Sequence, residues 1–154
     1  MELDFSKKIK SQSNAAMLPG LADIALVYRT AQFVAHGFHN LVKGQTFFED
    51  HEFLGELYGK YEGAYDSCVE RIIAFTGTAD VTGITSKASA AAAQYNPNGK
   101  SSSEMFLTIL NFEKNFCAMI KTVVPDSTDG TQNFLQGLAD ESEMRQYKIS
   151  QKIR

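Results

Sequence analysis

The chain has 154 residues, 44% of them hydrophobic, which is enough apolar material for one domain with a buried core. A formal net charge of −3 excludes a strong overall attraction to nucleic acid. The two cysteines, Cys68 and Cys117, lack metal-type spacing, which excludes a disulfide framework and a zinc ribbon and favours a reducing, cytoplasmic location. Since no apolar run reaches the length of a signal peptide or a membrane span, we expect a soluble protein without a membrane partner.

The first half of the chain is predicted to form two long helices. Residues 1–16 are expected to be a flexible segment that precedes a single domain over residues 17–154. The first helix is predicted from Pro19, a favourable first-turn residue, to Val42, because apolar residues recur there every three or four positions. The second helix is predicted over residues 48–75, with Gly77 as its C-cap.

The second half is predicted to add two more long helices after a long connection. Residues 78–100 are rich in small and turn-forming residues, and we expect a short helix near 86–94 within them. Ser101 and Glu104 fit a capping box at the start of the third long helix, which Pro125 ends. The fourth is predicted over residues 131–152. The sequence therefore predicts an all-α four-helix bundle with a short extra helix between its second and third long helices.

One face of the second helix carries metal-ligand residue types at both ends. At about 100° per residue, His51, Asp66 and Glu70 fall within one sector of that helix. The same sector holds three glycines, Gly55, Gly59 and Gly63. His51 lies roughly 22 Å from Asp66 along the axis, so they cannot share an ion within one chain. If two copies pack antiparallel across a twofold axis, His51 of one approaches Asp66 and Glu70 of the other, and the glycines let the backbones come close.

A further histidine, His39, precedes His51 by twelve residues, across the turn predicted between the first two helices. Two histidines from one copy, with an aspartate and a glutamate from the other, make a nitrogen and oxygen ligand set that suits iron(II), and zinc or manganese less distinctively. Taken singly, each histidine also has an ordinary interpretation as a surface or capping residue, and Asp66 and Glu70 as solvated helix charges. The combination favours a metal site.

The segment HGFHNLVKGQTFFEDH, residues 36–51, resembles the signature of the Dps mini-ferritins, the DNA-binding proteins from starved cells. The resemblance continues through Glu52, residues 57–58, Asp66 and residues 69–72, is densest over residues 33–77, and is weaker in the last two long helices. It implies a ferritin-like bundle, assembled from twofold dimers into a hollow dodecamer with a ferroxidase centre at each dimer interface. It further implies that His39, His51, Asp66 and Glu70 are the iron ligands there.

The resemblance also implies a function. Such a shell oxidises Fe(II) with hydrogen peroxide or oxygen and stores the ferric mineral inside, which protects against oxidative damage. Iron is the expected metal, and zinc is an alternative occupant of the same site. Asp126 and Asp129 are candidates for an acidic pore, although Asn133 stands at a position that is acidic in some family members.

Other residues near the expected site have less specific interpretations. His36 matches a family histidine that is not a ligand, and we expect it to pack beside the site. Tyr58, Tyr61 and Tyr65 are expected at the core or the interface, with electron transfer as the alternative role.

Two positions depart from the family pattern and leave alternatives open. Asn40 stands where the family usually has a tryptophan, and Gly55 stands where it often has an aspartate that supports a second iron. The alternatives are a shell that binds DNA or another divalent metal with little ferroxidase turnover, and a purely structural shell. The residues available for phosphate contacts are Lys7, Lys8, Lys10, Arg145, Lys148, Lys152 and Arg154. Such a charge run is more often a solvated face.

Overall fold

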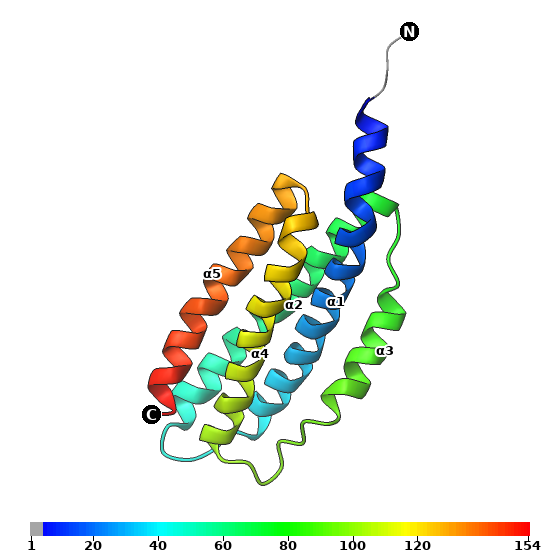
Figure 1. Cartoon of the computed structure of the whole chain (residues 1–154). Helices are drawn as coiled ribbons and strands as arrows, with labels where there is room; N and C mark the ends of the chain where they lie inside the picture. Colours follow the sequence, from blue (N-terminus) through cyan, green and yellow to red (C-terminus); the bar gives the residue numbers. More distant parts are fainter. Residues whose placement is uncertain (1–4) are drawn as a thin grey trace.

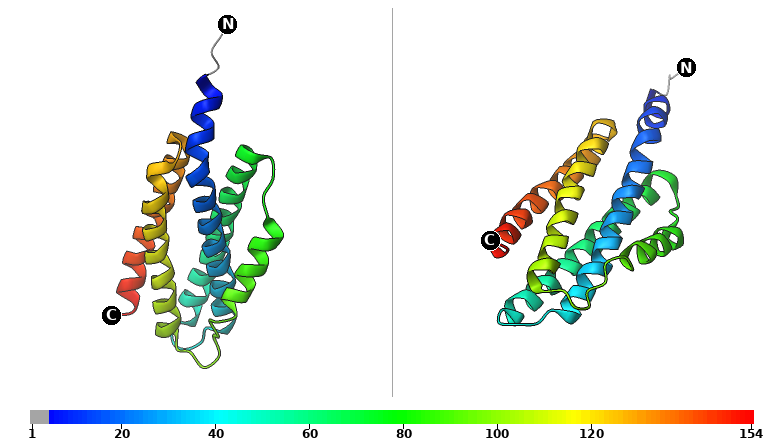
Figure 2. Two further views of the ribbon diagram at one scale, coloured as in Figure 1. Left: turned by 45° about the vertical axis from the view of Figure 1, so that its right-hand side comes forward. Right: turned by 60° about the horizontal axis from the view of Figure 1, so that its bottom comes forward.

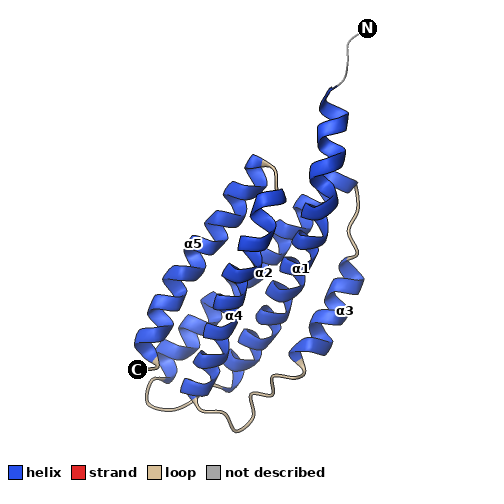
Figure 3. Ribbon diagram, in the orientation of Figure 1, coloured by secondary structure: helices blue, strands red, loops and turns tan. Residues whose placement is uncertain are grey.

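The computed structural model describes residues 5–154, with side chains from Ala15 onward. Within that range the chain is helical and contains no strand (Figure 3). The elements are α1 (Phe5–Leu41), α2 (Phe47–Thr76), α3 (Val81–Ala92), α4 (Ser102–Val123), a 3-10 turn η1 (Val124–Asp126) and α5 (Asp129–Lys152). The four long helices form a bundle with α3 lying against α1 (Figure 1), which confirms the predicted fold class.

The connection between α2 and α4 sets the topology of the bundle. The helices α1 and α2 form one antiparallel pair, and α4 and α5 form a second pair that packs on it through α1 and α4. The chain between α2 and α4 returns along the length of the bundle and carries α3, so α2 and α4 run in the same direction (Figure 2). One long crossover of this kind is typical of ferritin-like bundles.

Most of the helix ends follow local signals in the sequence. The capping box at the start of α4 is present, because the Glu104 amide donates to Ser101 Oγ at 3.2 Å and the Ser101 amide donates to Glu104 Oε2 at 2.7 Å. Gly77 ends α2 with a φ of 82°, in the left-handed region where a side chain is disfavoured, and its amide donates to the Ile73 carbonyl.

Two helices begin five or more residues before the predicted start. The first, α1, begins at Phe5 and continues through Pro19, with Met17 already fully buried on the bundle. A proline inside a helix removes one hydrogen bond, and the packing of the residues around it outweighs that loss. Residues 1–4 of the predicted flexible segment lie outside the described residues. The second, α3, begins at Val81 rather than at residue 86, because the Asp80 side chain caps it by accepting from the Gly83 amide at 3.0 Å.

The core runs along the axis of the bundle and is rich in aromatic residues. Tyr28, Phe38, Tyr61 and Phe116 are fully buried, and each such side chain contributes on the order of 1.5–3 kcal/mol through burial. Cys68 is also buried, and desolvation raises the pKa of its thiol to about 12, so it behaves as a small apolar residue. Among residues 5–154, no helix is long and apolar enough to cross a bilayer.

Candidate metal centre

His39 and His51 meet where the end of α1 packs beside the start of α2. The imidazole rings stack with their centroids 3.7 Å apart. His39 Nδ1 lies 2.8 Å from the backbone carbonyl of His51, and His51 Nδ1 lies 2.9 Å from the backbone carbonyl of His39. The structure therefore brings together the two histidines that the sequence placed twelve residues apart.

The reciprocal hydrogen bonds determine the tautomer of both rings. A carbonyl oxygen only accepts, so each Nδ1 must carry a hydrogen and donate it. In a neutral imidazole this places the free lone pair on Nε2, which is the arrangement of a metal-ligating histidine oriented by a backbone carbonyl. The local geometry therefore fits a pair of nitrogen ligands for a divalent metal.

Aromatic rings surround the histidine pair. Phe47 stacks on His51 with a centroid distance of 5.0 Å, and Tyr58 meets His39 edge-on at 5.4 Å. His36 is exposed and stacks on Tyr58 at 4.3 Å, which is the packing role expected for it. These contacts limit the rotation of the two candidate ligands.

Gly55 lies against the His39 ring. A Cβ built at this position would meet His39 Cε1 at 3.2 Å and Nδ1 at 3.3 Å, closer than ordinary van der Waals contact. The His39 ring thus lies against the position at which the resemblance to the Dps family led us to expect an aspartate. An aspartate at position 55 would require the His39 ring to shift by a few tenths of an ångström.

Asp50, which precedes His51 in α2, carries a buried carboxylate. Asp50 is 3% exposed and receives hydrogen bonds from Thr46 (2.7 Å) and Ser102 (2.6 Å) and an ion pair from Lys152 (2.8 Å). Burial by itself raises the pKa of this carboxyl, but the three donors outweigh that effect and hold the pKa below its ordinary value. Asp50 therefore joins the start of α2 to α4 and α5. Sequence reasoning missed it, since nothing in the local pattern shows that the partners converge.

Asp66 and Glu70 lie farther along α2, both exposed to solvent. Among the described residues, no three histidine, cysteine, aspartate or glutamate side chains gather closely enough within one chain to hold a metal. Gly59 and Gly63 share this exposed side of α2, and a Cβ at either would meet no described atom within 4 Å. These two glycines therefore do not serve close packing inside the chain.

The structure corrects the residues considered for DNA binding. Arg145 is buried and bonded to Glu113, and Lys152 is paired with Asp50, so neither guanidinium nor ammonium is free for a phosphate. The side chains of Lys7, Lys8 and Lys10 lie outside the described part of the chain. The two pore candidates, Asp126 and Asp129, are exposed at the corner between α4 and α5, and Asn133 is exposed one turn into α5.

Comparison with known proteins places this chain in a family. The family model of the ferritin-like domain matches residues 24–154. The chain therefore belongs to the ferritin-like domain family. No curated protein matches it significantly in sequence.

Solved structures share its fold at low sequence identity. Dps from Staphylococcus aureus is 19% identical with a TM-score of 0.81, over 90% of this chain and 95% of that one. A Dps protein from Bacillus brevis is 20% identical with a TM-score of 0.75, over the whole of both chains. The DPS protein from Vibrio cholerae O1, described as a member of a broad superfamily of ferritin-like diiron-carboxylate proteins, is 16% identical with a TM-score of 0.81, over 94% and 92%. The fold of this chain is that of the Dps proteins.

Proposed function

We propose that this protein is a mini-ferritin that oxidises Fe(II), with hydrogen peroxide or oxygen as acceptor, and stores the ferric product in a hollow shell. The observation that carries the proposal is the histidine pair, in which both Nδ1 atoms are held by backbone carbonyls and both Nε2 atoms are left to bind metal. Membership of the ferritin-like family supports iron as the substrate metal.

The proposed site is completed by a second copy of the chain. His39 and His51 of one copy supply nitrogen ligands, and Asp66 and Glu70 of the other supply carboxylates from successive turns of α2. An antiparallel, twofold contact along the open side of Gly59 and Gly63 brings the two halves together and forms two sites at once. Twofold dimers would then assemble into a dodecamer.

The proposed chemistry is a two-electron reduction of peroxide. Two Fe(II) ions each give up one electron, and hydrogen peroxide takes both electrons and two protons, so the products are two Fe(III) ions and two molecules of water. Histidine and carboxylate ligands suit Fe(II) and, through the carboxylates, stabilise the Fe(III) that forms. Pairing the electrons avoids the one-electron cleavage of peroxide that releases hydroxyl radical.

The first experiment is an anaerobic titration of Fe(II) into metal-free protein, followed by hydrogen peroxide. Bound iron per subunit is recorded, together with the co-elution of ferric iron with a large assembly. Replacing His51 by alanine should abolish most Fe(II) binding because a ligand is lost. The matched control is His36→Phe, which keeps the ring stacked on Tyr58 and removes both nitrogens; it should bind iron normally.

The stoichiometry then decides the role of Gly55. Two irons per subunit would mean that another residue supplies the ligand that an aspartate at position 55 would have provided. One iron per subunit would assign the site to His39, His51, Asp66 and Glu70 alone. Assembly without iron binding would contradict the ferroxidase proposal and favour a structural shell or occupation by zinc.

A further inference from the structure

The centre of the bundle contains a polar cluster that the proposed ferroxidase site does not use. It has one side chain from each long helix, Tyr28 of α1, Tyr61 of α2, Glu113 of α4 and Arg145 of α5. Glu113 is completely buried, and its Oε1 accepts from the Tyr61 hydroxyl at 2.5 Å and from Arg145 Nε at 2.6 Å. A carboxylate in such a position is costly unless it is paired and hydrogen-bonded.

The hydrogen bond between Tyr61 and Glu113 joins a phenol to a base in a dry environment. Burial, and then the neighbouring Glu113 charge, raise the pKa of the Tyr61 phenol well above its ordinary range, so the resting residue keeps its proton. A phenol that loses one electron becomes a strong acid and must release that proton. Glu113 is placed to receive it along the existing hydrogen bond.

We propose that Tyr61 is a one-electron donor of this protein, with Glu113 as its proton acceptor. A one-electron oxidant such as hydroxyl radical takes an electron from Tyr61 and a proton from solvent and becomes water. The phenolic proton moves to Glu113 Oε1, which leaves a neutral phenoxyl radical on Tyr61 and a neutral carboxylic acid on Glu113. A one-electron reductant such as a thiolate later returns the electron and is itself oxidised to a thiyl radical, and Glu113 returns the proton.

Arg145 can keep its charge through this step. Its Nη1 lies 3.2 Å from Glu141 Oε2 at the surface of α5, so a second carboxylate compensates the guanidinium when Glu113 is protonated. When Glu113 is neutral, Arg145 is still paired with the Glu141 carboxylate. Its buried positive charge therefore keeps an opposing negative charge.

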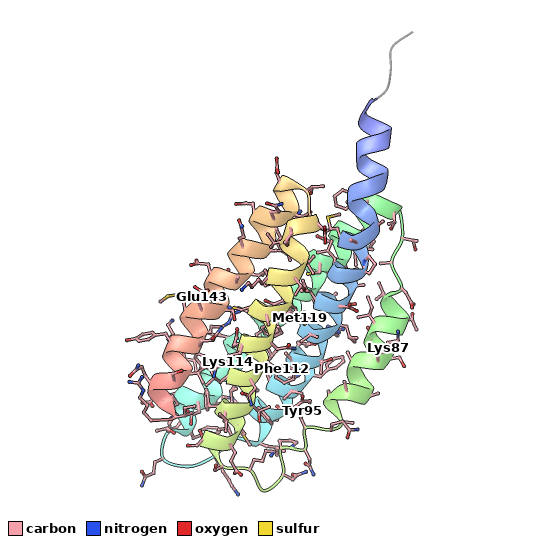
Figure 4. The ribbon with its side chains drawn as sticks, viewed as in Figure 1. Lys87, Tyr95, Phe112, Lys114, Met119 and Glu143 are labelled. Carbon is pink, nitrogen blue, oxygen red and sulfur yellow. The ribbon has the colours of Figure 1, made fainter. Side chains whose placement is uncertain are left out.

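A row of aromatic rings connects Tyr61 to the surface. Tyr61 meets Phe116 at a centroid distance of 5.3 Å, Phe116 meets Phe112 at 6.3 Å, and Phe112 meets Tyr95 at 5.2 Å. Tyr95 follows α3 and is exposed, and Figure 4 shows it beside Phe112 of α4. Tyr95 is therefore the point at which an oxidant or reductant in solution can exchange an electron with the buried tyrosine.

Tyr28 is a built-in comparison for Tyr61. The two rings lie 5.9 Å apart, both are fully buried, and Tyr28 stacks on the same Phe116 at 4.0 Å. Among the described residues, however, the Tyr28 hydroxyl has no hydrogen-bond partner. Glu113 Oε2 also has no partner in that part of the chain, but no hydrogen bond joins it to the Tyr28 hydroxyl. Tyr28 therefore lacks a bonded acceptor for its proton and is not expected to form a stable radical.

The test uses iron-free protein, so its outcome does not depend on the proposed ferroxidase activity. A photogenerated ruthenium(III) tris-bipyridine oxidises the protein, and the phenoxyl radical is followed by transient absorption and electron paramagnetic resonance. The wild type and Tyr28→Phe should give a long-lived radical, and Tyr61→Phe should lose it. Glu113→Gln should form it about 100-fold more slowly, the scale expected for a lost general base.

Each result bears on the proposal. Loss of the long-lived radical in Tyr61→Phe, with retention in Tyr28→Phe, supports it, and a slower signal in Tyr95→Phe supports the aromatic route. An unchanged radical yield and lifetime in Tyr61→Phe would overturn it, as would loss of the signal in Tyr28→Phe alone. Both phenylalanine variants keep the aromatic ring, so circular dichroism can verify that each is folded.

Discussion

Two polar regions of the molecule, the buried cluster in the bundle centre and the outer side of α2, differ in how many of their polar groups find partners within one chain. In the centre of the bundle, Tyr61 and Arg145 both bond to Glu113 Oε1 within one chain, away from solvent, while Glu113 Oε2 has no partner among the described residues. On the outer side of α2, His39 and His51 are oriented but lack further ligands, and Asp66 and Glu70 extend into solvent. The buried region therefore makes its polar contacts within one chain, whereas under the proposed function the outer region is half of a site.

This difference separates the variants that should affect folding from those that should affect assembly. A change in the buried network removes a partner from a charge that cannot reach water, so it should lower the stability of the monomer. A change on the outer side of α2 alters groups that are open in the single chain, so its cost should appear only when two chains meet. The four predictions below test that separation.

The largest effect is expected for Gly59→Leu. A Cβ at this position meets no described atom within 4 Å beyond the backbone of its own helix. Replacing a helical glycine by a residue with a side chain also stabilises the helix by up to roughly 1 kcal/mol. The variant should therefore fold normally and lose the assembled shell, as measured by sedimentation or light scattering. Ala90→Leu, at an exposed position of α3, is the control and should keep the shell. An intact shell with Gly59→Leu would contradict the proposed interface.

Next in size is the effect of Glu113→Ala on stability. It leaves the guanidinium of Arg145 buried without its main partner, and such a loss typically costs about 3–5 kcal/mol. Urea unfolding of wild type and variant gives the difference. Replacing both Glu113 and Arg145 by methionine should recover most of the stability, since an apolar pair needs no charge partner. A cost well below 1 kcal/mol for Glu113→Ala would show that the network is not buried as described.

A smaller effect, dependent on pH, is expected from Asp50. Folding lowers the pKa of the Asp50 carboxyl. Such a group stabilises the protein at any pH above its pKa in the unfolded chain, about 3.9, and this stabilisation is lost as the pH falls through the pKa in the folded protein. Asp50→Asn should cost about 1.5–3 kcal/mol at neutral pH, typical of hydrogen bonds to a charged group, and little in strong acid. Unfolding free energies measured from pH 7 down to pH 2 test this, with exposed Asp140→Asn as the control.

The smallest effect is expected for Tyr28→Phe. The substitution removes a buried hydroxyl that has no hydrogen-bond partner among the described residues, so stability should be unchanged or rise by up to about 1 kcal/mol. Tyr61→Phe removes a hydroxyl that serves Glu113 and should cost about 1–2 kcal/mol. If thermal unfolding showed the same loss of stability for both variants, the proposed difference in hydrogen bonding between Tyr28 and Tyr61 would be wrong.

The fold was largely predictable because its signals are local. The capping box at Ser101, the glycine at 77 and the helical spacing of apolar residues each depend on neighbours within a few positions. The start of α1 was not predicted, since Pro19 is a start signal locally and its place inside a longer helix depends on packing against distant residues.

The candidate site was predictable in its residue types but not in its geometry. Helical spacing placed His51, Asp66 and Glu70 on one side of α2, whereas the contact of His39 with Gly55 depends on how α1 crosses α2. The buried partnership of Glu113 with Arg145 joins residues 32 positions apart, and each reads as an ordinary charged residue in its own helix. Such pairs become visible only when the helices are placed in space.

The paired hydrogen bonds between His39 and His51 also close a loop. They tie together two backbone positions on either side of the turn between α1 and α2, so opening this turn must break both bonds. The amides of the turn should therefore exchange with solvent more slowly than is usual for an exposed loop. A metal bound by both rings would add its binding free energy to the same closure, so that metal occupancy could be measured as slowed hydrogen exchange at one corner of the bundle.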